Sequence, residues 1–550
     1  MAIHKLSDSQ PRNRIGFVEE EAPKDAVMEL AKLCGYDLFR FEPSHLVAPT
    51  LASTAAVIFT QLATRPRKIL RQLERYAGAL LCHDCRVFVQ PVMSRPGANG
   101  PAFRSMIVSL LNTLRLPPSG LSEEETKSFD DWFAGADVPS LTPVVHVLEG
   151  PNVWHEIALM LRNHPPGPLS LYELSVEAVD AEGRVMTLTT EQLTLVRRAF
   201  SDCASVKLIG LKNGLSDVLT FRAFAELRGG NVGSKWPYLY FVKIGERAKI
   251  SREFLAYELN ALENIPYHLG PSLRLERCGL GYLQGIIISD YVSGAETLRD
   301  CARAGRAVPV IANLFNSTLW AWRNSGAHEP TALQQLLLKE MPKTIPSHRK
   351  PLIETYSRSP SVERLKNKFL ANPSVPVVVG VIHGDLHATN VLVRGGDAIV
   401  IDFEKIWSRG PLLWDMACLE GGLFVDGFVG DVRRGVELLQ SIRCLYDAPA
   451  FDDANVIPCH PSDGSAWFFD CVRQIRMQAR QVELKPRQYA LTLAVALAKK
   501  GCNEYDFRYE RTGDSAAADR LSREEVRALA YVLSEKILDG LLQQPPGDDA

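Results

Sequence analysis

Residues 381–393 read VIHGDLHATNVLV, a polar loop between two apolar runs that are rich in β-branched residues. After a Gly-Gly turn, residues 398–404 read AIVIDFE, a second strand that a tight turn returns alongside the first. Asp402 ends that strand, and Asp385 and Asn390 lie five residues apart in the loop. The sequence therefore predicts that two carboxylates and one amide meet at one edge of a small sheet.

Phosphoryl transfer is the chemistry that suits this arrangement. It needs an aspartate that orients and deprotonates the acceptor hydroxyl, and oxygen ligands for the Mg²⁺ that bridges the phosphates. Asp385 fits the base, while Asn390 and Asp402 fit the metal ligands because both offer hard oxygen donors. A hairpin with an Asx turn and incidental acidic residues is the alternative interpretation.

The motif has a family resemblance. His-Gly-Asp-x-His-x-x-Asn at 383–390, followed by Ile-Asp-Phe at 401–403, resembles the catalytic and metal loops of the aminoglycoside phosphotransferase and choline kinase-like superfamily. Leu-Trp-Asp-Met-Ala at 413–417 resembles that superfamily's segment with an aspartate that supports the catalytic loop, which implies a structural role for Asp415. The resemblance spans about residues 206–425 and implies an α+β bilobal, protein-kinase-like domain that uses ATP and Mg²⁺.

A strand with a single charge precedes this motif. Residues 238–245 read YLYFVKIG, and an ammonium among such neighbours is unfavourable unless it meets a phosphate or carboxylate. Lys243 resembles the lysine that pairs with the ATP phosphates. Glu253 and Glu258 of the next helix lie about 140° apart around its axis, so only one can face Lys243. The family pattern favours Glu253, and a solvated glutamate is the alternative for either.

Two further segments resemble parts of a nucleotide site. In the turn Leu-Lys-Asn-Gly-Leu-Ser-Asp, which resembles the superfamily's phosphate-side turn, Gly214 would allow close backbone approach and Ser216 could donate to a phosphate oxygen. An ordinary hairpin turn explains the same residues equally well. The strand at 284–292 resembles the hinge between the lobes, so backbone groups from Asp290 to Val292 would meet adenine.

A narrower resemblance concerns a bacterial subgroup. Phe-Val-Lys-Ile-Gly at 241–245, Arg-Glu-x-x-x-Tyr at 252–257 and Asp-Met-Ala-x-Leu-Glu at 415–420 resemble the ternary-complex-associated domains of predicted signalling and conflict systems. The region 437–542 is mostly helical by its period and would form the helical subdomain that shapes the acceptor site.

The N-terminal residues 1–165 alternate short apolar strands with segments of helical period, which predicts an α/β domain with an open parallel sheet. The order resembles a flavodoxin-like or receiver-like domain. A receiver needs an aspartate closing the third strand and a lysine closing the fifth, where this chain has Thr60 and Glu149. Any such receiver is therefore degenerate. The expected strands are Arg14–Val18, Tyr36–Phe41, Ala55–Thr60, Arg86–Val92 and Val144–Leu148.

A chain of 550 residues exceeds the size of one hydrophobic core, so several domains are expected. A Pro/Gly cluster marks the end of the first one. We expect a bridging segment at 166–205, a kinase-like N-lobe at 206–292 and a C-lobe at 293–542. The tail 543–550, with Pro, Gly and Asp, cannot bury apolar surface and should be disordered.

Composition excludes several other classes. A net charge of −2 gives no electrostatic case for binding nucleic acid or anionic membranes, and no apolar run reaches the length of a membrane helix. Eleven irregularly spaced cysteines favour reduced thiols in a cytoplasmic protein. Cys-His-Asp-Cys at 82–85 has no second pair for a zinc site, so a helix end that runs into a strand is the better interpretation.

Two functions remain open. The first is a kinase that moves the γ-phosphate of ATP to a hydroxyl acceptor, small molecule or protein, in a bacterial signalling or conflict system. The second is a nucleotide-binding regulatory module whose N-terminal domain offers a surface to a protein partner. Asp385, Asn390 and Asp402 favour the enzyme, because a binding module needs no base. An antibiotic-resistance kinase is less favoured, since such enzymes normally lack an N-terminal α/β domain.

Overall fold

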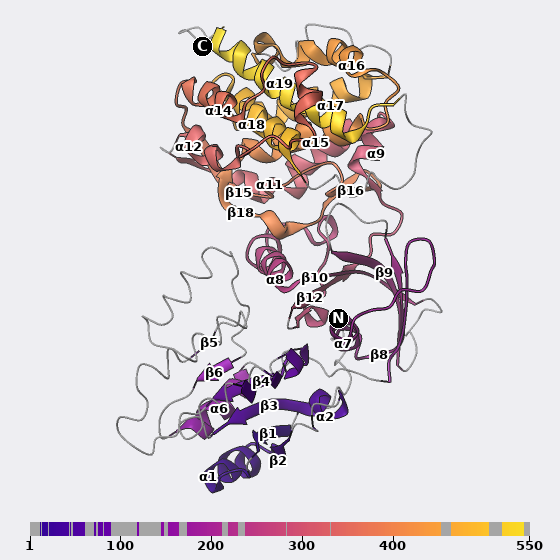
Figure 1. Ribbon diagram of the computed structural model, residues 1–550, viewed down its shortest axis with the longest axis vertical. Helices are drawn as coiled ribbons and strands as arrows, with labels where there is room; N and C mark the ends of the chain where they lie inside the picture. Colours follow the sequence, from indigo (N-terminus) through magenta and orange to yellow (C-terminus); the bar gives the residue numbers. More distant parts are fainter. Residues whose placement is uncertain are drawn as a thin grey trace. The chain divides into compact units, whose positions relative to one another are not determined.

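The computed structural model describes most of the chain, in stretches separated by gaps. They are residues 12, 14–19, 21–42, 45, 48–60, 71–72, 75–76, 78–80, 82–89, 118–119, 145–147, 152–163, 173–211, 218–228, 237–281, 283–329, 332–452, 464–504 and 520–543. The chain divides into two compact units, one of residues 1–255 with 273–291 and one of residues 256–272 with 292–550. Figure 1 traces the elements of both along the sequence.

The first unit begins with a parallel sheet of order β2-β1-β3-β4-β6-β5. The open parallel sheet expected from the sequence is thus present, with β3 buried along its whole length. One face of the sheet packs Ile15, Phe17 and Ile58 against helix residues Leu30 and Ile157. The strands are β1 (Arg14–Val18), β2 (Asp37–Phe41), β3 (Thr54–Phe59), β4 (Arg86–Val89), β5 (Pro118–Ser119) and β6 (Val145–Val147). The helices are α1 (Lys24–Ala26) with the π-helical turn Val27–Leu33, α2 (Ala48–Ser53) and α6 (Val153–Asn163).

A second sheet completes the first unit, with the order β11-β12-β10-β9-β8-β7. It corrects one boundary, because the described part of the expected bridging segment 166–205 is built into this sheet layer. Strand β7 pairs with β8, and α7 buries Leu195 and Val196 in the sheet's core. The elements are β7 (Ser175–Val179), α7 (Thr190–Ala199), β8 (Cys203–Gly210), β9 (Leu219–Leu227), β10 (Tyr238–Glu246), α8 (Arg247–Ala256), β11 (Gly279–Leu280) and β12 (Gln284–Asp290).

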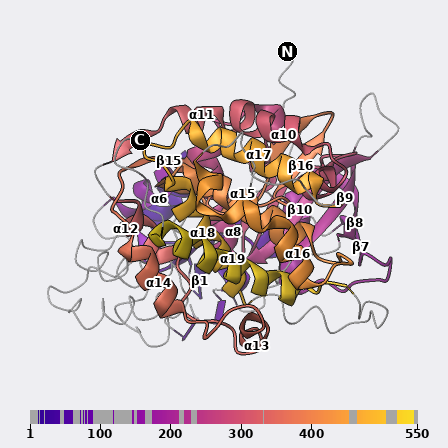
Figure 2. The same ribbon diagram turned by 90° about the horizontal axis from the view of Figure 1, so that it is seen from above.

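The second unit is mainly helical around α15 and α18, which are buried along nearly their whole length. Figure 2 shows α15, α17, α18 and α19 side by side in orange and yellow. The helices are α9 (Leu298–Arg303), α10 (Ala307–Asn313), α11 (Trp320–Asn324), α12 (Leu333–Leu337), α13 (Lys350–Glu354), α14 (Val362–Ala371), α15 (Leu413–Gly427), α16 (Gly435–Ile442), α17 (Ala466–Arg480), α18 (Gln488–Cys502) and α19 (Arg523–Gln543).

Two small antiparallel sheets, of order β13-β16-β17 and β14-β15-β18, carry the polar motif of the second unit. Strands β16 and β17 form the expected hairpin through Gly395 and Gly396, both with positive φ. The polar loop joins β15 of one sheet to β16 of the other. The strands are β13 (Glu296–Thr297), β14 (Ala327–Glu329), β15 (Val377–Ile382), β16 (Val391–Arg394), β17 (Asp397–Val400) and β18 (Trp407–Pro411).

The cysteines differ in part from the expectation. Nine cysteines in the described residues are free, but Cys444 is disulfide-bonded, so a wholly reduced set of thiols is wrong. A single pair that the fold brings together leaves no regular spacing in the sequence to reveal it. Cys85 donates to the carbonyls of Leu51 and Thr54, which fits the helix end that was expected at 82–85. Within the described part of the chain, no helix combines the length and apolarity needed to cross a bilayer.

Candidate active site

Asp415, in the first turn of α15, holds the start of the polar loop. The backbone N–H groups of His383 and Gly384 donate to its two carboxylate oxygens at 2.7 and 2.9 Å. The neighbouring Trp414 donates from Nε1 to the Gly384 carbonyl at 3.0 Å. Burial raises the pKa of the Asp415 carboxyl, while the two backbone bonds favour its carboxylate. These contacts match the supporting role that the resemblance implies.

The loop is also locked to the end of β17. His383 is fully buried, and its Nε2 donates to the Ile401 carbonyl at 3.0 Å, which assigns the proton to that nitrogen. Gly384 has a φ of +78°, and a Cβ there would lie 2.1 Å from the carbonyl oxygen of Lys405. Only glycine permits this approach, so the position of the loop is set by backbone contacts on both sides.

The structure brings the three predicted residues of the motif together. Asn390 donates from Nδ2 to the Asp385 carbonyl at 3.2 Å, and its own carbonyl accepts from the N–H of Ile401 at 3.0 Å. Asp402 follows Ile401 directly and has a left-handed backbone, with φ 67° and ψ 73°. Non-glycine residues rarely take this conformation, and those that do often lie at functional sites.

Two lysines surround the Asp385 carboxylate. Lys405 Nζ lies 2.8 Å from Oδ2, and Lys500 Nζ lies 3.6 Å from Oδ1. Burial by itself raises the pKa of Asp385, but Lys500, His387 and Lys405 together hold it well below its usual range. The carboxylate therefore stays ionised at neutral pH. We did not identify Lys405 or Lys500 from the sequence: Lys405 lies within reach of the motif, three residues after Asp402, but no sequence signal marks Lys500.

His387 is uncharged and is held in place within the loop. Burial, and then the charge of Lys500, lowers the pKa of His387 to about 4, so its imidazole is neutral at neutral pH. Its Nδ1 lies 2.8 Å from the Thr389 hydroxyl, and its Cβ side lies against Gly422. These contacts fix the ring, and they make His387 part of the scaffold of the loop.

The donors near Asp402 suit Mg²⁺. The Nδ2 of Asn390 is used by the Asp385 carbonyl, which leaves its Oδ1, a hard oxygen donor, for a metal ion. The Asp402 carboxylate is a second such donor. In the described stretches, no group of three or more His, Cys, Asp or Glu could hold a metal ion.

Lys243 and Glu253 form an ion pair in the first unit. Their side chains meet at 2.6 Å and are only 12% and 10% exposed. Glu258 is exposed, so the structure assigns Glu253 as the partner of Lys243 and resolves the choice that the sequence left open. The pair joins β10 to α8, as expected.

The other predicted nucleotide contacts stay predictions. The Asp290 carboxylate accepts two hydrogen bonds from Arg274, at 2.7 and 2.9 Å, but the prediction concerns backbone groups, which this contact does not test. The N–H of the next residue, Tyr291, donates to the Leu239 carbonyl. Val292 begins the second unit's share of the chain. Gly214 and Ser216 lie outside the described residues.

Comparison with known proteins gives one family match. A family model described as ternary complex associated domain 9 matches residues 355–498. No curated protein matches the chain.

Several solved structures are similar at low identity. A thermostable mutant of aminoglycoside phosphotransferase APH(4)-Ia, in complex with ADP and hygromycin B, is 14% identical, with a TM-score of 0.35 over 63% of this chain and 97% of that one. Choline kinase LicA from Streptococcus pneumoniae is 16% identical, with a TM-score of 0.31 over 62% and 94%. A glucosamine kinase is 13% identical, with a TM-score of 0.33 over 64% and 85%.

The family match covers the loop 383–390, the β16–β17 hairpin, α15 and most of α18, all of which belong to the second unit. It confirms, for residues 355–498, the resemblance to ternary-complex-associated domains; the segments 241–245 and 252–257, which also carried that resemblance, lie outside the matched residues.

Proposed function

We propose that the chain is an ATP- and Mg²⁺-dependent phosphotransferase that moves the γ-phosphoryl group to a hydroxyl acceptor. One observation carries the proposal: a loop fixed by backbone bonds to Asp415 gathers Asp385, Asn390 and Asp402. A binding module has no need of a carboxylate held ionised beside two potential metal ligands. Phosphoryl transfer needs that combination.

Each residue then has a distinct task. Asp385 accepts a hydrogen bond from the acceptor hydroxyl and takes its proton as the acceptor oxygen bonds to the γ-phosphorus and the bond to ADP breaks. Lys243, oriented by Glu253, binds the ATP phosphates. Mg²⁺, bound by Asn390 and Asp402, would neutralise negative charge on the phosphates.

Metal-dependent nucleotide binding tests this proposal directly. We expect the full chain to bind ATP more tightly with Mg²⁺ than without it in calorimetric titrations. Asp402→Ala should remove most of the Mg²⁺-dependent gain, because it deletes the only charged metal ligand. Asp397→Ala, in the same hairpin but outside the site, is the matched control. Equal ATP affinity of the parent chain with and without Mg²⁺ would contradict the proposal.

The acceptor and the setting belong to the same proposal. The acceptor is a hydroxyl of a small molecule or a protein, and the enzyme acts in a bacterial signalling or conflict system, as its similarity to ternary-complex-associated domains suggests. A cytoplasmic location fits the nine free cysteines of the described residues, while the disulfide-bonded Cys444 counts against it.

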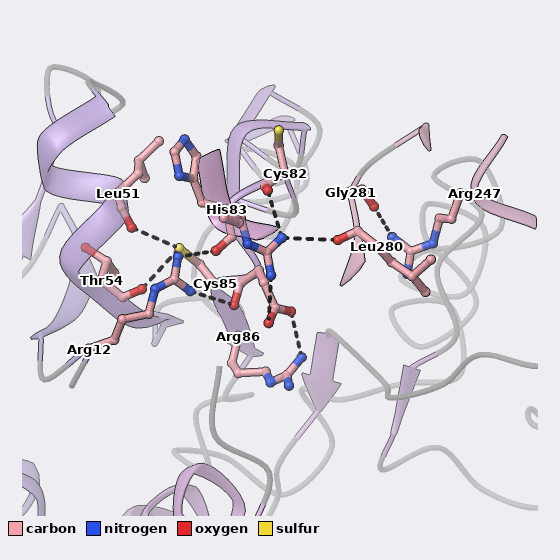
Figure 3. A network of polar contacts seen from close by, with 12 residues as sticks. Arg12, Leu51, Thr54, Cys82, His83, Cys85, Arg86, Arg247, Leu280 and Gly281 are labelled. Carbon is pink, nitrogen blue, oxygen red and sulfur yellow. Dashed lines mark hydrogen bonds and ion pairs between the residues drawn. The ribbon is translucent and has the colours of Figure 1, made fainter. Parts of the chain in front are cut away.

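A second candidate function is regulatory, and a specific polar network favours it (Figure 3). Arg198 of α7 lies 3.4 Å from the Asp84 carboxylate of the N-terminal segment and donates to the Cys82 carbonyl at 3.1 Å. The same guanidinium donates to the Leu280 carbonyl at 3.3 Å. Arg198 is 5% exposed, so it joins the two sheets of the first unit by buried contacts.

The network continues to the helix that carries Glu253. Arg247, the first residue of α8, donates to the Gly281 carbonyl, next to the Leu280 carbonyl that Arg198 binds (Figure 3). A short series of contacts therefore links the N-terminal sheet to the start of α8. In this candidate function, a partner that binds the N-terminal sheet changes the position of α8 and hence the Lys243 pair.

The N-terminal sheet is a reasonable docking module. The order β2-β1-β3-β4-β6 is the 2-1-3-4-5 order of flavodoxin-like and receiver-like domains. Met28, Leu33 and Leu159 expose 50%, 69% and 42% of their surface on adjacent helices, which suits a protein partner.

The two candidates differ in their response to Arg198→Gln. A regulatory link requires this variant to change ATP affinity or turnover at least threefold. Arg184→Gln, which removes an exposed ion pair of the same unit, should change neither. If both variants behave like the parent chain in calorimetry and turnover assays, the N-terminal sheet does not control the site.

A further inference from the structure

Asp385 lies between two ammonium groups, and this arrangement has no structural purpose that the fold explains. Lys405 Nζ is 2.8 Å from one carboxylate oxygen and Lys500 Nζ is 3.6 Å from the other. Asp385, Lys405 and Lys500 together therefore carry a net positive charge, and Asp385 is the proposed base. A half-exposed ion pair contributes little to stability, so stability alone does not account for Lys405.

The backbone places Lys405 between Asp402, the proposed metal ligand, and Asp385, the proposed base. It ends the 3-10 turn Phe403–Lys405, which begins directly after Asp402. Its carbonyl oxygen lies so close to Gly384 that no other residue fits there. Its side chain is 54% exposed, which leaves the ammonium group room to move. Lys405 is thus held by its backbone between the metal-binding residue and the base.

Lys500 is the more buried of the two lysines. It belongs to the last turn of α18, and its side chain is only 17% exposed. At 3.6 Å its contact with Asp385 is too long for a hydrogen bond. Within the described residues its ammonium group has this ion pair and no hydrogen bond. A largely buried ammonium group in that position is stabilised by an anion that comes within hydrogen-bond distance.

We propose that Lys405 and Lys500 are catalytic residues that bind the phosphoryl group while it passes from ATP to the acceptor. This inference rests on the proposed phosphotransferase function. The transferring group carries its negative charge on three equatorial oxygens, and fixed cations near those oxygens stabilise the transition state.

In the step itself, the acceptor oxygen bonds to the γ-phosphorus, the bond from that phosphorus to the bridging oxygen breaks, and ADP leaves with the electron pair. Asp385 takes the proton of the acceptor hydroxyl. Lys405 moves its hydrogen bond from Asp385 to an equatorial oxygen, which also frees Oδ2 to accept that proton. Lys500, beside Oδ1, donates to a second equatorial oxygen and completes the cationic side of the site.

A transition-state mimic separates this role from simple nucleotide binding. Mg²⁺ and ADP with aluminium fluoride imitate the transferring phosphoryl group, so an active site binds that mixture more tightly than Mg²⁺ and ADP alone. Lys405→Met and Lys500→Met should keep the affinity for Mg²⁺ and ADP within about threefold of the parent value. They should lose most of the increase in affinity that aluminium fluoride causes. Their kcat for ATP, with water as the acceptor, should fall about 10²–10³-fold, the usual loss when one charge-stabilising donor is removed.

Three controls make the outcome decisive. Lys350→Met removes an exposed lysine of α13 and should leave binding and kcat unchanged. Lys405→Arg keeps a cation and should restore part of the fluoride gain. Thermal unfolding checks that the variants fold; should Lys500→Met not fold, the exposed Lys405 carries the test.

The possible failures are distinguishable. A parent chain that neither turns over ATP nor gains affinity from fluoride overturns the proposed function, and the lysine role with it. If the parent chain turns over ATP and gains affinity from aluminium fluoride, and the Lys405→Met and Lys500→Met variants do the same, the proposed role of the two lysines is wrong but the proposed function stands.

Discussion

Three aspartates of the second unit show how the environment of a residue sets its role. Asp415 has both oxygens bonded to backbone N–H groups, so it cannot receive a proton from a substrate without breaking the loop. Asp385 is bound by two lysine side chains and by no backbone N–H group that the structure describes, so those side chains can exchange for other partners. Asp402 lies in a left-handed position directly after Ile401, whose N–H donates to the Asn390 backbone carbonyl. In the proposed function, the same type of side chain would therefore support the loop, accept a proton or bind metal according to its neighbours.

Lys243 is the residue whose loss should most directly reduce ATP affinity. Lys243→Ala removes one charge-assisted contact with phosphate, about 1.5–3 kcal/mol, which corresponds to roughly a 10–150-fold weaker affinity. Glu258→Ala, on the exposed face of the same helical segment, is the control and should not change ATP binding. Calorimetry measures both. Equal affinity in Lys243→Ala and the parent chain would remove Lys243 from the site.

The candidate site was predictable from the sequence only where its residues are close along the chain. Asp385, Asn390 and Asp402 belong to one motif, so their meeting followed from a loop and a hairpin. Lys500 reaches the site through helix packing, which no local pattern reports. The choice of Glu253 over Glu258 as the partner of Lys243 depended on which helix face packs on the sheet.

At the scale of elements, strands were easier to predict than the sheets they join. The first three strands of the N-terminal sheet were located within one or two residues, because short apolar runs between turn residues mark buried strands. The segment with β7 and α7 was assigned to a bridge between domains at 166–205. Its partner strand β8 follows only after the intervening helix, and parallel pairing across a helix leaves no turn signal in the sequence.

Gly384 tests the contact between the loop after β15 and the turn after β17. Gly384→Ala places a Cβ 2.1 Å from the Lys405 carbonyl, whereas Gly395→Ala, also at positive φ, meets no atom within 4 Å. Both variants strain the backbone by about 1 kcal/mol, but only Gly384→Ala adds a steric conflict of roughly 1–3 kcal/mol. Urea unfolding should show this difference. Equal destabilisation by both would mean that the loop moves freely.

At the scale of the whole molecule, the division into two units differs from a simple boundary between lobes. The end of the helix after β10 and the segment that follows it, residues 256–272, belong with the C-terminal unit. Sequence patterns mark elements and linkers, but the assignment of an element to a core depends on side-chain packing. The N-lobe at 206–292 therefore stays a prediction, since most of it falls in one compact unit with the N-terminal residues.

Folding stability should depend on pH through the buried His83. Burial, then the charges of Arg12 and Arg198, lowers the pKa of His83 to about 3 from an ordinary value of 6.5. Below pH 6.5 the unfolded chain binds a proton that the folded chain does not, so stability falls as the pH falls from 6.5 toward 3. By pH 5 the loss from this group is about 2 kcal/mol.

Variants of two histidines check this dependence. His83→Gln should reduce the difference between urea unfolding at pH 7.5 and at pH 5, whereas His328→Gln, at an exposed position, should not. The same pH dependence in His83→Gln and the parent chain would show that His83 accepts a proton in the folded state.

The central claim is that Asp385 acts as the base of a phosphotransferase, and Asp385→Asn tests it most directly. The change keeps the size of the side chain and removes its charge. We predict little change in ATP affinity and melting temperature, because the proposed metal and phosphate ligands remain. Turnover of ATP, with water as the default acceptor, should fall about 10²–10⁴-fold, the usual contribution of general-base catalysis. A variant that hydrolyses ATP at the parent rate would contradict the account and favour the regulatory module.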